Sequence, residues 1–198
     1  MKFFSSILPT VGIAMLGAVS VLAQSSDVII TGLQTVTQSS RDLRTVVETI
    51  TLFNAPVQGP KVATGLTNIG QSVVTVTKTI TQGNFDPFSD DVAEDIVAAL
   101  TAFVQVHQAL LDTIIGKHRM LTLVGFHVPC ILFSIIQGIL QKTPFTKPVG
   151  LALQGLEAIV DTFAFAIIGL IPTRQDTAMT QLTSLDVTFT QSTNVYNS

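Results

Sequence analysis

Two carboxylates on one predicted helix are the residues whose spacing most directly suggests chemistry. Glu157 and Asp161 stand four positions apart, which places both carboxylates on one helical face. Such a pair could bind a metal ion or act as a general acid and base. We favour the alternative, a solvated strip opposite the apolar core, because no His or Cys accompanies them at metal-ligand spacing. The sequence therefore predicts no metal site here.

The three histidines and the single cysteine offer little more. His107 lies on an apolar helical stripe, where it could be a ligand, a polar anchor inside a pocket, or a core residue satisfied by a backbone carbonyl. Together with His118 and His127 it is too widely spaced to suggest zinc. Cys130 has no internal disulfide partner, so we interpret it as a small buried hydrophobe, with pairing between molecules as the alternative.

Catalytic and cofactor motifs are missing from the sequence. The segment closest to a nucleophile elbow, GQSVV at 70–74, lacks the second glycine and falls inside a helical pattern. The chain has no phosphate-binding glycine loop, no H-E-x-x-H and no C-x-x-C. We therefore predict that the protein is not an enzyme and uses no cofactor.

The first residues read as an export signal. Lys2 precedes an apolar run at 7–22, and Val-Leu-Ala at 21–23 provides a small-residue cleavage site. We predict a signal peptide over 1–23 and a secreted chain from Gln24, with an uncleaved membrane anchor as the alternative.

Composition narrows the function further. Hydrophobic residues make up 47% of the chain and charged residues only 12%, about half the usual charged fraction. Without Lys2 the chain has 9 basic and 13 acidic residues, a formal charge of −4, which argues against nucleic acid as a partner. A surface rich in Thr and Ser suits a secreted or cell-wall protein, or is simply a neutral hydrogen-bonding surface.

The helix that would hold the carboxylate pair has the most regular pattern. Residues 149–171 repeat apolar positions at steps of four and three, which indicates an amphipathic helix with a wide apolar face. Pro172 ends it, and Thr173 with Asp176 predicts the capped start of a last helix. The stripe consists of Val149, Leu153, Leu156, Val160, Phe163, Ile167 and Leu170.

Three earlier segments show the same spacing. The first, 27–53, has a stripe interrupted only at Ser40, and a turn is expected at 54–60 because it holds two prolines and a glycine. The second helix is expected over 62–82. The third starts at Ser89 and closes near Lys117 and His118, cations that favour a helix C-terminus. The prediction is an all-α, single-domain bundle of five to six amphipathic helices with an apolar interior, over 24–198.

Residues 120–140 differ from the rest because they are apolar on every face and long enough to cross a bilayer. They could form a buried central helix, a transmembrane span, or a segment foreign to the fold.

Four stretches resemble the fungal hydrophobic surface-binding protein A family, which includes cell-wall galactomannoproteins. They are IIGKH at 114–118, TPFTKPVGLALQGLE at 143–157, LEAIVDTFAFAIIGLIPT at 156–173 and SLDVTFTQSTNVY at 184–196. This resemblance implies an all-helical secreted domain that binds fatty acids or adsorbs to hydrophobic surfaces, in some members helping hydrolases to reach insoluble polymers. The family has no catalytic motif to carry over.

The chain departs from the family pattern at 119–137, which intervenes where members pass almost directly from GKH to TPF. Deleting 120–137 leaves GKHRGILQKTPFTKP and restores the family-like spacing. The segment is therefore an atypical apolar insertion or a translated intron. Sequencing the transcript distinguishes the two.

Wide apolar stripes can surround an acyl chain or simply pack together, and the resemblance favours binding. We predict that the ligand is a fatty acid or another long-chain lipid. Further expected partners are hydrophobic surfaces and a secreted hydrolase. The alternative is an integral membrane protein with spans near 120–140 and 149–171, although the two carboxylates in the second span argue against it. The predicted cavity residues are Leu100, Phe103, Leu110, Leu156, Val160, Phe163 and Ile167.

Overall fold

The computed structural model describes residues 17–51, 54–83, 85–124 and 146–197. This part of the chain is helical and contains no strand, so the predicted all-α class is confirmed. The elements are α1 (Gly17–Glu48), α2 (Ala55–Gln82), α3 (Asp90–Val124), α5 (Thr146–Ile168), the short 3₁₀ helix η1 (Pro172–Arg174) and α6 (Gln175–Asn197).

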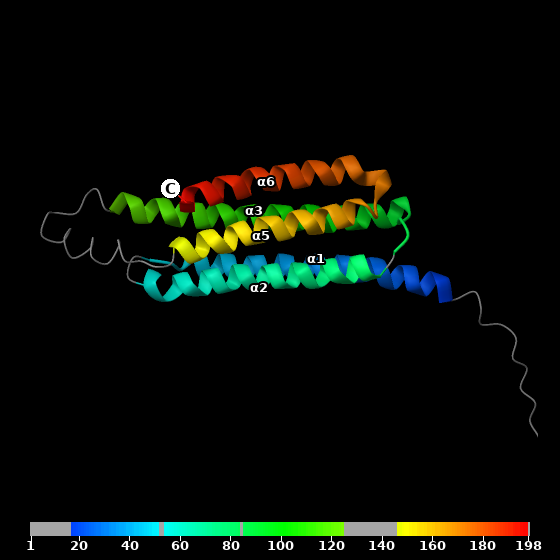
Figure 1. The fold of residues 1–198 in the computed structure, drawn as a ribbon, viewed down its shortest axis with the longest axis horizontal. Helices are drawn as coiled ribbons and strands as arrows, with labels where there is room; N and C mark the ends of the chain where they lie inside the picture. Colours follow the sequence, from blue (N-terminus) through cyan, green and yellow to red (C-terminus); the bar gives the residue numbers. More distant parts are fainter. Residues whose placement is uncertain (1–16, 52–53, 84, 125–145, 198) are drawn as a thin grey trace, which may run out of the picture.

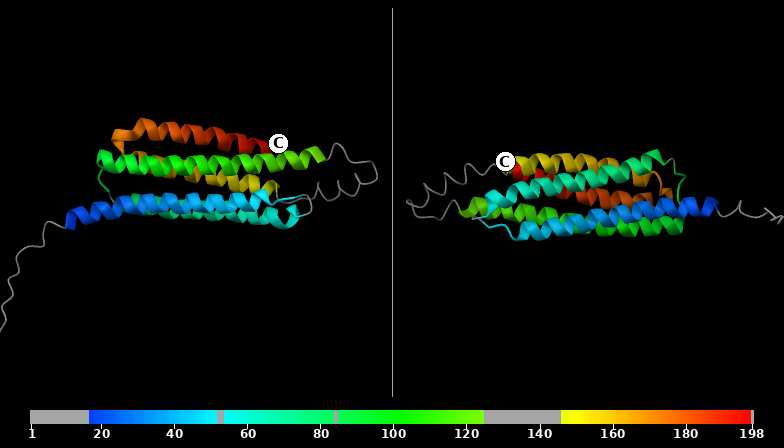
Figure 2. Two further views of the ribbon diagram at one scale, coloured as in Figure 1. Left: turned by 180° about the vertical axis from the view of Figure 1, so that it is seen from behind. Right: turned by 90° about the horizontal axis from the view of Figure 1, so that it is seen from below.

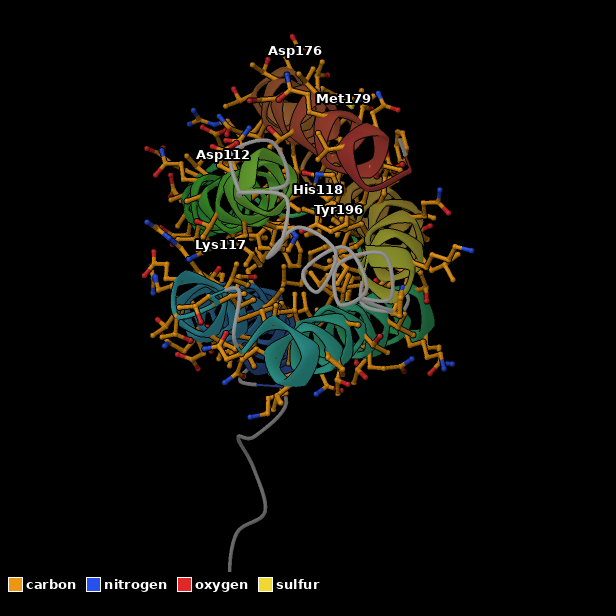
Figure 3. All side chains as sticks on the ribbon, turned by 90° about the vertical axis from the view of Figure 1, so that its left-hand side faces the viewer. Asp112, Lys117, His118, Asp176, Met179 and Tyr196 are labelled. Atoms are coloured by element: carbon orange, nitrogen blue, oxygen red, sulfur yellow. The ribbon has the colours of Figure 1, made fainter. Side chains whose placement is uncertain are left out.

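The five α-helices of the described residues lie side by side along one long axis (Figures 1 and 2). Each packs mainly against two neighbours, in the closed order α1, α2, α5, α6, α3 and back to α1. Seen along this axis, the helices form a ring around a shared interior (Figure 3). Because the ring is closed, every helix has a neighbour on both sides. Two neighbours can cover an apolar stripe that is too wide to be buried against a single helix.

The interior is one continuous hydrophobic core to which all five helices contribute. The predicted four-three stripes point into it, and its largest side chains are fully buried. They include Phe103 of α3, Phe163 of α5 and Phe189 of α6.

The turn expected at 54–60 is wrong, because α2 already begins at Ala55 and includes both prolines. Pro56 lies in the first turn, where a missing N–H has no helical partner to lose. Asn54 directly precedes α2 and is hydrogen-bonded to residues that follow α1. Its side-chain oxygen accepts from the Thr51 N–H at 2.8 Å, and its amide donates to the Thr49 carbonyl at 3.1 Å.

The expected end of the third helix near Lys117 and His118 is also wrong, because α3 continues to Val124. Lys117 does not close its own helix. Its ammonium donates to the backbone carbonyls of Glu48 at 2.7 Å and Ile50 at 2.8 Å, at the C-terminal end of α1. The cation thus caps a neighbouring helix, where it meets unpaired carbonyls and the negative end of the helix dipole.

Part of the predicted segments lies outside the described residues. The predicted signal peptide, 1–23, is described only from Gly17, where α1 begins. The apolar segment 119–137 is described only as far as Val124, the last residue of α3. Cys130 and His127 fall outside this part of the chain.

The last helix does not start with Thr173 as its cap, since this residue lies within η1 and α6 begins at Gln175. Arg174 at the end of η1 instead binds α3. Its guanidinium donates to Asp90 through two hydrogen bonds of 2.9 Å and to Glu94 at 3.0 Å. The hydrogen bonds from Arg174 and then from Thr173 lower the pKa of Asp90. This contact ties the α5–α6 connection to the first turn of α3.

Replacing Lys117 tests the cap on α1. Lys117→Met keeps most of the aliphatic stem but removes the donor, so two carbonyls lose a charge-assisted bond. We expect a loss of about 1–2 kcal/mol in unfolding free energy, measured by urea denaturation. The exposed Lys78→Met in α2 is the control and should change stability by less than about 0.5 kcal/mol. Equal effects of the two substitutions would contradict the capping role.

Candidate functional site

The seven predicted cavity residues all lie in the shared interior. Three come from α3 and four from α5, two helices that both pack against α6. None of the seven is more than 3% exposed. The structure therefore brings them into one apolar cluster, and whether they contact a ligand stays a prediction.

The other three helices contribute equally to this interior, and the predicted set omitted them. Leu33 of α1, Leu66 of α2 and Phe189 of α6 are fully buried in the same cluster. Their four-three spacing is as clear as that of α3 and α5. The same signal, applied to every helix, would have identified them.

His107 is a fully buried polar residue within this apolar interior. Its Nδ1 lies 2.9 Å from the Ser40 hydroxyl oxygen of α1, so its partner is a side chain and not the backbone carbonyl expected for a core histidine. The ring contacts those of Phe103 and Phe189, with centroid distances of 5.2 and 5.4 Å. Burial lowers its pKa to about 4, so the imidazole is neutral at physiological pH.

Ser40 is the partner that sequence reasoning missed. It was visible only as the single break in the stripe of the first helix. A polar residue in each of two apolar stripes is a signal that the two could meet, because each needs a hydrogen bond once buried.

The sequence led us to expect that Glu157 and Asp161 form a solvated strip opposite the core, but they do not. Both are half-buried and face a third carboxylate, Asp186 of α6. Burial, then the Asp161 charge and hydrogen bond, then Glu157, raise the pKa of Asp186 to about 6. Burial and Asp161 also raise the pKa of Glu157. The α5–α6 seam therefore holds three carboxylates whose charges repel.

The described residues contain no group of three His, Cys, Asp or Glu side chains placed to hold a metal ion. Ser72, in the segment closest to a nucleophile elbow, lies inside α2 and donates to the Asn68 carbonyl at 3.1 Å.

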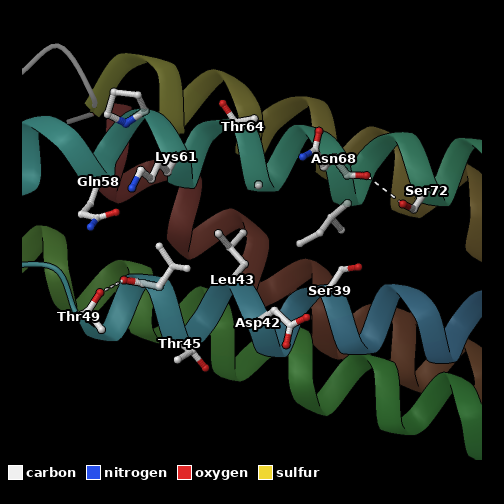
Figure 4. Close-up of a pocket in the computed structure, with 14 residues that line it drawn as sticks. Ser39, Asp42, Leu43, Thr45, Thr49, Gln58, Lys61, Thr64, Asn68 and Ser72 are labelled. Carbon is white, nitrogen blue, oxygen red and sulfur yellow. Dashed lines mark hydrogen bonds between the residues drawn. The ribbon is translucent and has the colours of Figure 1, made fainter.

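Two grooves follow the outside of the seam between α1 and α2, and the sequence did not predict them. The larger has a volume of about 770 Å³, and the smaller, of about 520 Å³, shares Ser72 with it. Figure 4 shows Leu43 of α1 reaching toward α2 in the larger groove. None of the seven predicted cavity residues lines either groove.

Two helical stretches, Asp90–His118 and Lys147–Ile168, are long and apolar enough to cross a membrane. In each, 39% of the most apolar window is buried within the bundle. Core helices of soluble proteins meet the same length and composition criteria.

No protein-family model matches the chain, and no curated protein matches its sequence. Two solved structures share its fold. One is AfMP4p in complex with palmitic acid, with a TM-score of 0.69 and 14% identity over 86% of this chain and 99% of that chain. The other is ligand binding domain 1 of the Penicillium marneffei MP1 protein complexed with arachidonic acids, with a TM-score of 0.60 and 12% identity over 87% and 98%. At these identities the likeness shows a common fold.

Two groups with shifted pKa values, Asp186 and His107, should give opposite pH dependences of stability. Asp186 has a folded pKa of about 6 against an ordinary value of 3.8. Its contribution to the free energy of unfolding is therefore present below pH 3.8 and lost as the pH rises through 6. His107 has a folded pKa of about 4 against 6.5, so its contribution is present above pH 6.5 and lost as pH falls toward 4.

We therefore expect Asp186→Asn to be more stable than the parent protein at pH 7. Its unfolding free energy should then fall more steeply between pH 6.5 and 4, because the opposing effect of Asp186 is removed. Urea denaturation at several pH values measures this. The exposed Asp112→Asn controls for loss of one charge and should leave the profile unchanged. An unchanged profile for Asp186→Asn would show that the seam does not strain the fold.

Proposed function

We propose that this protein binds long-chain fatty acids or related lipids in the interior of its helical ring, without catalysing a reaction. The observation that carries the proposal is the closed ring of five helices around one apolar interior. The same fold occurs in two proteins whose structures contain fatty acids. Five apolar stripes that converge on one axis offer a long, narrow and nonpolar environment, as an acyl chain requires.

The expected affinity is moderate. Burying about ten methylene groups at roughly 0.8 kcal/mol each contributes about 8 kcal/mol before ordering costs. The loss of ligand and side-chain freedom reduces this sum, so we expect micromolar or weaker binding.

We further propose that the chain is secreted and associated with the cell wall, as in the hydrophobic surface-binding protein A and galactomannoprotein family that its sequence resembles. The export signal predicted at 1–23 and the weakly charged, hydroxyl-rich exterior support this location. Adsorption to hydrophobic surfaces and cooperation with a secreted hydrolase are parts of the same proposal.

Lipid binding predicts that protein purified from its producing cells carries fatty acid. Native mass spectrometry should show a bound mass of a long-chain acid that disappears after delipidation and returns when palmitic acid is added. A protein that is isolated lipid-free and then takes up no acid would refute the function.

The proposal also predicts no turnover of ester, peptide or glycosidic substrates, because the sequence offers no nucleophile and base. The measurement is hydrolysis by purified protein. Activity that disappears on substitution of one buried polar residue would show an active site that the motifs do not reveal.

The integral membrane alternative is tested by where the protein fractionates. A secreted binder should appear in the culture medium, starting near Gln24 when its N-terminus is sequenced. A protein that remains in membrane pellets after carbonate washing would support spans near 120–140 and 149–171 instead.

A further inference from the structure

Among the described residues, four side-chain polar atoms are buried without a hydrogen-bond partner. Three of them, on Asp161, Asp186 and Thr193, belong to α5 and α6. The fourth is Nε2 of His107, which lies among the apolar side chains of the interior. Leaving a polar atom unpaired in such surroundings destabilises the fold, so the unpaired nitrogen calls for an explanation.

The two contacts of Ser40 fix the proton on His107. Its hydroxyl oxygen lies 3.0 Å from the Val36 carbonyl oxygen and 2.9 Å from Nδ1. A carbonyl can only accept, so both contacts can be hydrogen bonds at the same time only if the single hydroxyl proton is donated to Val36. The contact with Nδ1 is then a hydrogen bond only if Nδ1 carries the ring proton and donates it to Ser40.

In the arrangement that satisfies both contacts of Ser40, Nε2 has a lone pair and no proton. The ring is neutral because burial alone lowers its pKa, with no charged side chain acting on it. Its hydrogen-bond partner Ser40 on α1 and its two aromatic neighbours, Phe103 on α3 and Phe189 on α6, are uncharged. A neutral acceptor attracts a hydrogen-bond donor and does not compensate a buried carboxylate.

The position of His107 on α3 relates this acceptor to the proposed ligand. Phe103 and Leu110, two of the predicted cavity residues, lie one turn to either side of it on the same stripe, and Phe103 contacts its ring. A lipid along this part of the interior would pass the lone pair of Nε2.

We propose that Nε2 of His107 accepts a hydrogen bond from an uncharged hydroxyl group of the bound lipid, either a long-chain alcohol or a fatty acid in its protonated form. This inference rests on the proposed function and adds the chemical class of the ligand's polar group. Fatty acid would then bind together with a proton.

Three C16 ligands test this on the full delipidated protein: 1-hexadecanol, 1-methoxyhexadecane, which lacks the O–H, and palmitic acid. We expect hexadecanol to bind about tenfold more tightly than the methyl ether. Palmitic acid should weaken about tenfold per pH unit above the pKa of the free acid, by proton linkage. Hexadecanol, measured at the same pH values, should stay constant and so controls for titration of the α5–α6 carboxylates.

His107→Phe retains an aromatic ring beside Phe103 and Phe189 but removes the acceptor, so the preference for alcohol over ether should disappear. The wild-type protein supplies a second readout that needs no variant. The ¹⁵N resonance of Nε2 should move when hexadecanol is added and stay in place with the ether.

The outcomes separate the two proposals. If none of the C16 ligands binds, the proposed function itself fails. If the alcohol and the ether bind equally and the Nε2 resonance moves with neither, lipid binding stands but the role of His107 is overturned. A palmitate affinity that does not change between pH 6 and 9 would show that the carboxylate form is bound. This result would also overturn the role proposed for His107.

Discussion

The simultaneous burial of five wide apolar stripes is the constraint on which the structure depends. A stripe such as that of α5 is too wide for one partner, and the ring gives each helix two neighbours and a shared interior. The outer faces can then be polar with few charges. Many threonines on these faces, such as Thr67 and Thr162, donate to the carbonyl four residues earlier and keep their oxygen lone pairs for water. This explains how a chain with 12% charged residues can present a hydrated surface.

The fold was predictable from sequence to the extent that it follows from periodicity within single helices. The stripes of residues 62–82 and 149–171 indicated helices and their buried faces, because side chains three and four apart share a face. Helix ends were less predictable. Lys117 reads as the cap of its own helix, since a sequence shows a cation near an end but not that the C-terminus of α1 lies beside it.

The polar contacts of the interior were not predictable for the same reason. Spacing revealed the pair Glu157 and Asp161 but not Asp186, which is remote in sequence and adjacent only after α6 packs on α5. His107 and Ser40 each appeared as an exception within an apolar stripe. Periodicity sets the angle of a residue around its helix, whereas pairing also requires the order of helices in the ring and their alignment along the axis.

That alignment needs contacts more specific than apolar stripes, which would allow neighbouring helices to slide past each other by a turn. Polar pairs fix α3 against α1, and Arg174 fixes η1 against α3.

Between α1 and α2, two glycines help to set the alignment. A Cβ on Gly32 would lie 2.7 Å from Val76, and one on Gly65 would lie 2.5 Å from Leu43, so each glycine receives a side chain of the facing helix. These two contacts require the absence of a side chain, and the apolar stripes require only hydrophobicity at a given spacing. Many sequences can satisfy the stripes, which agrees with structures that share the ring at 12–14% identity.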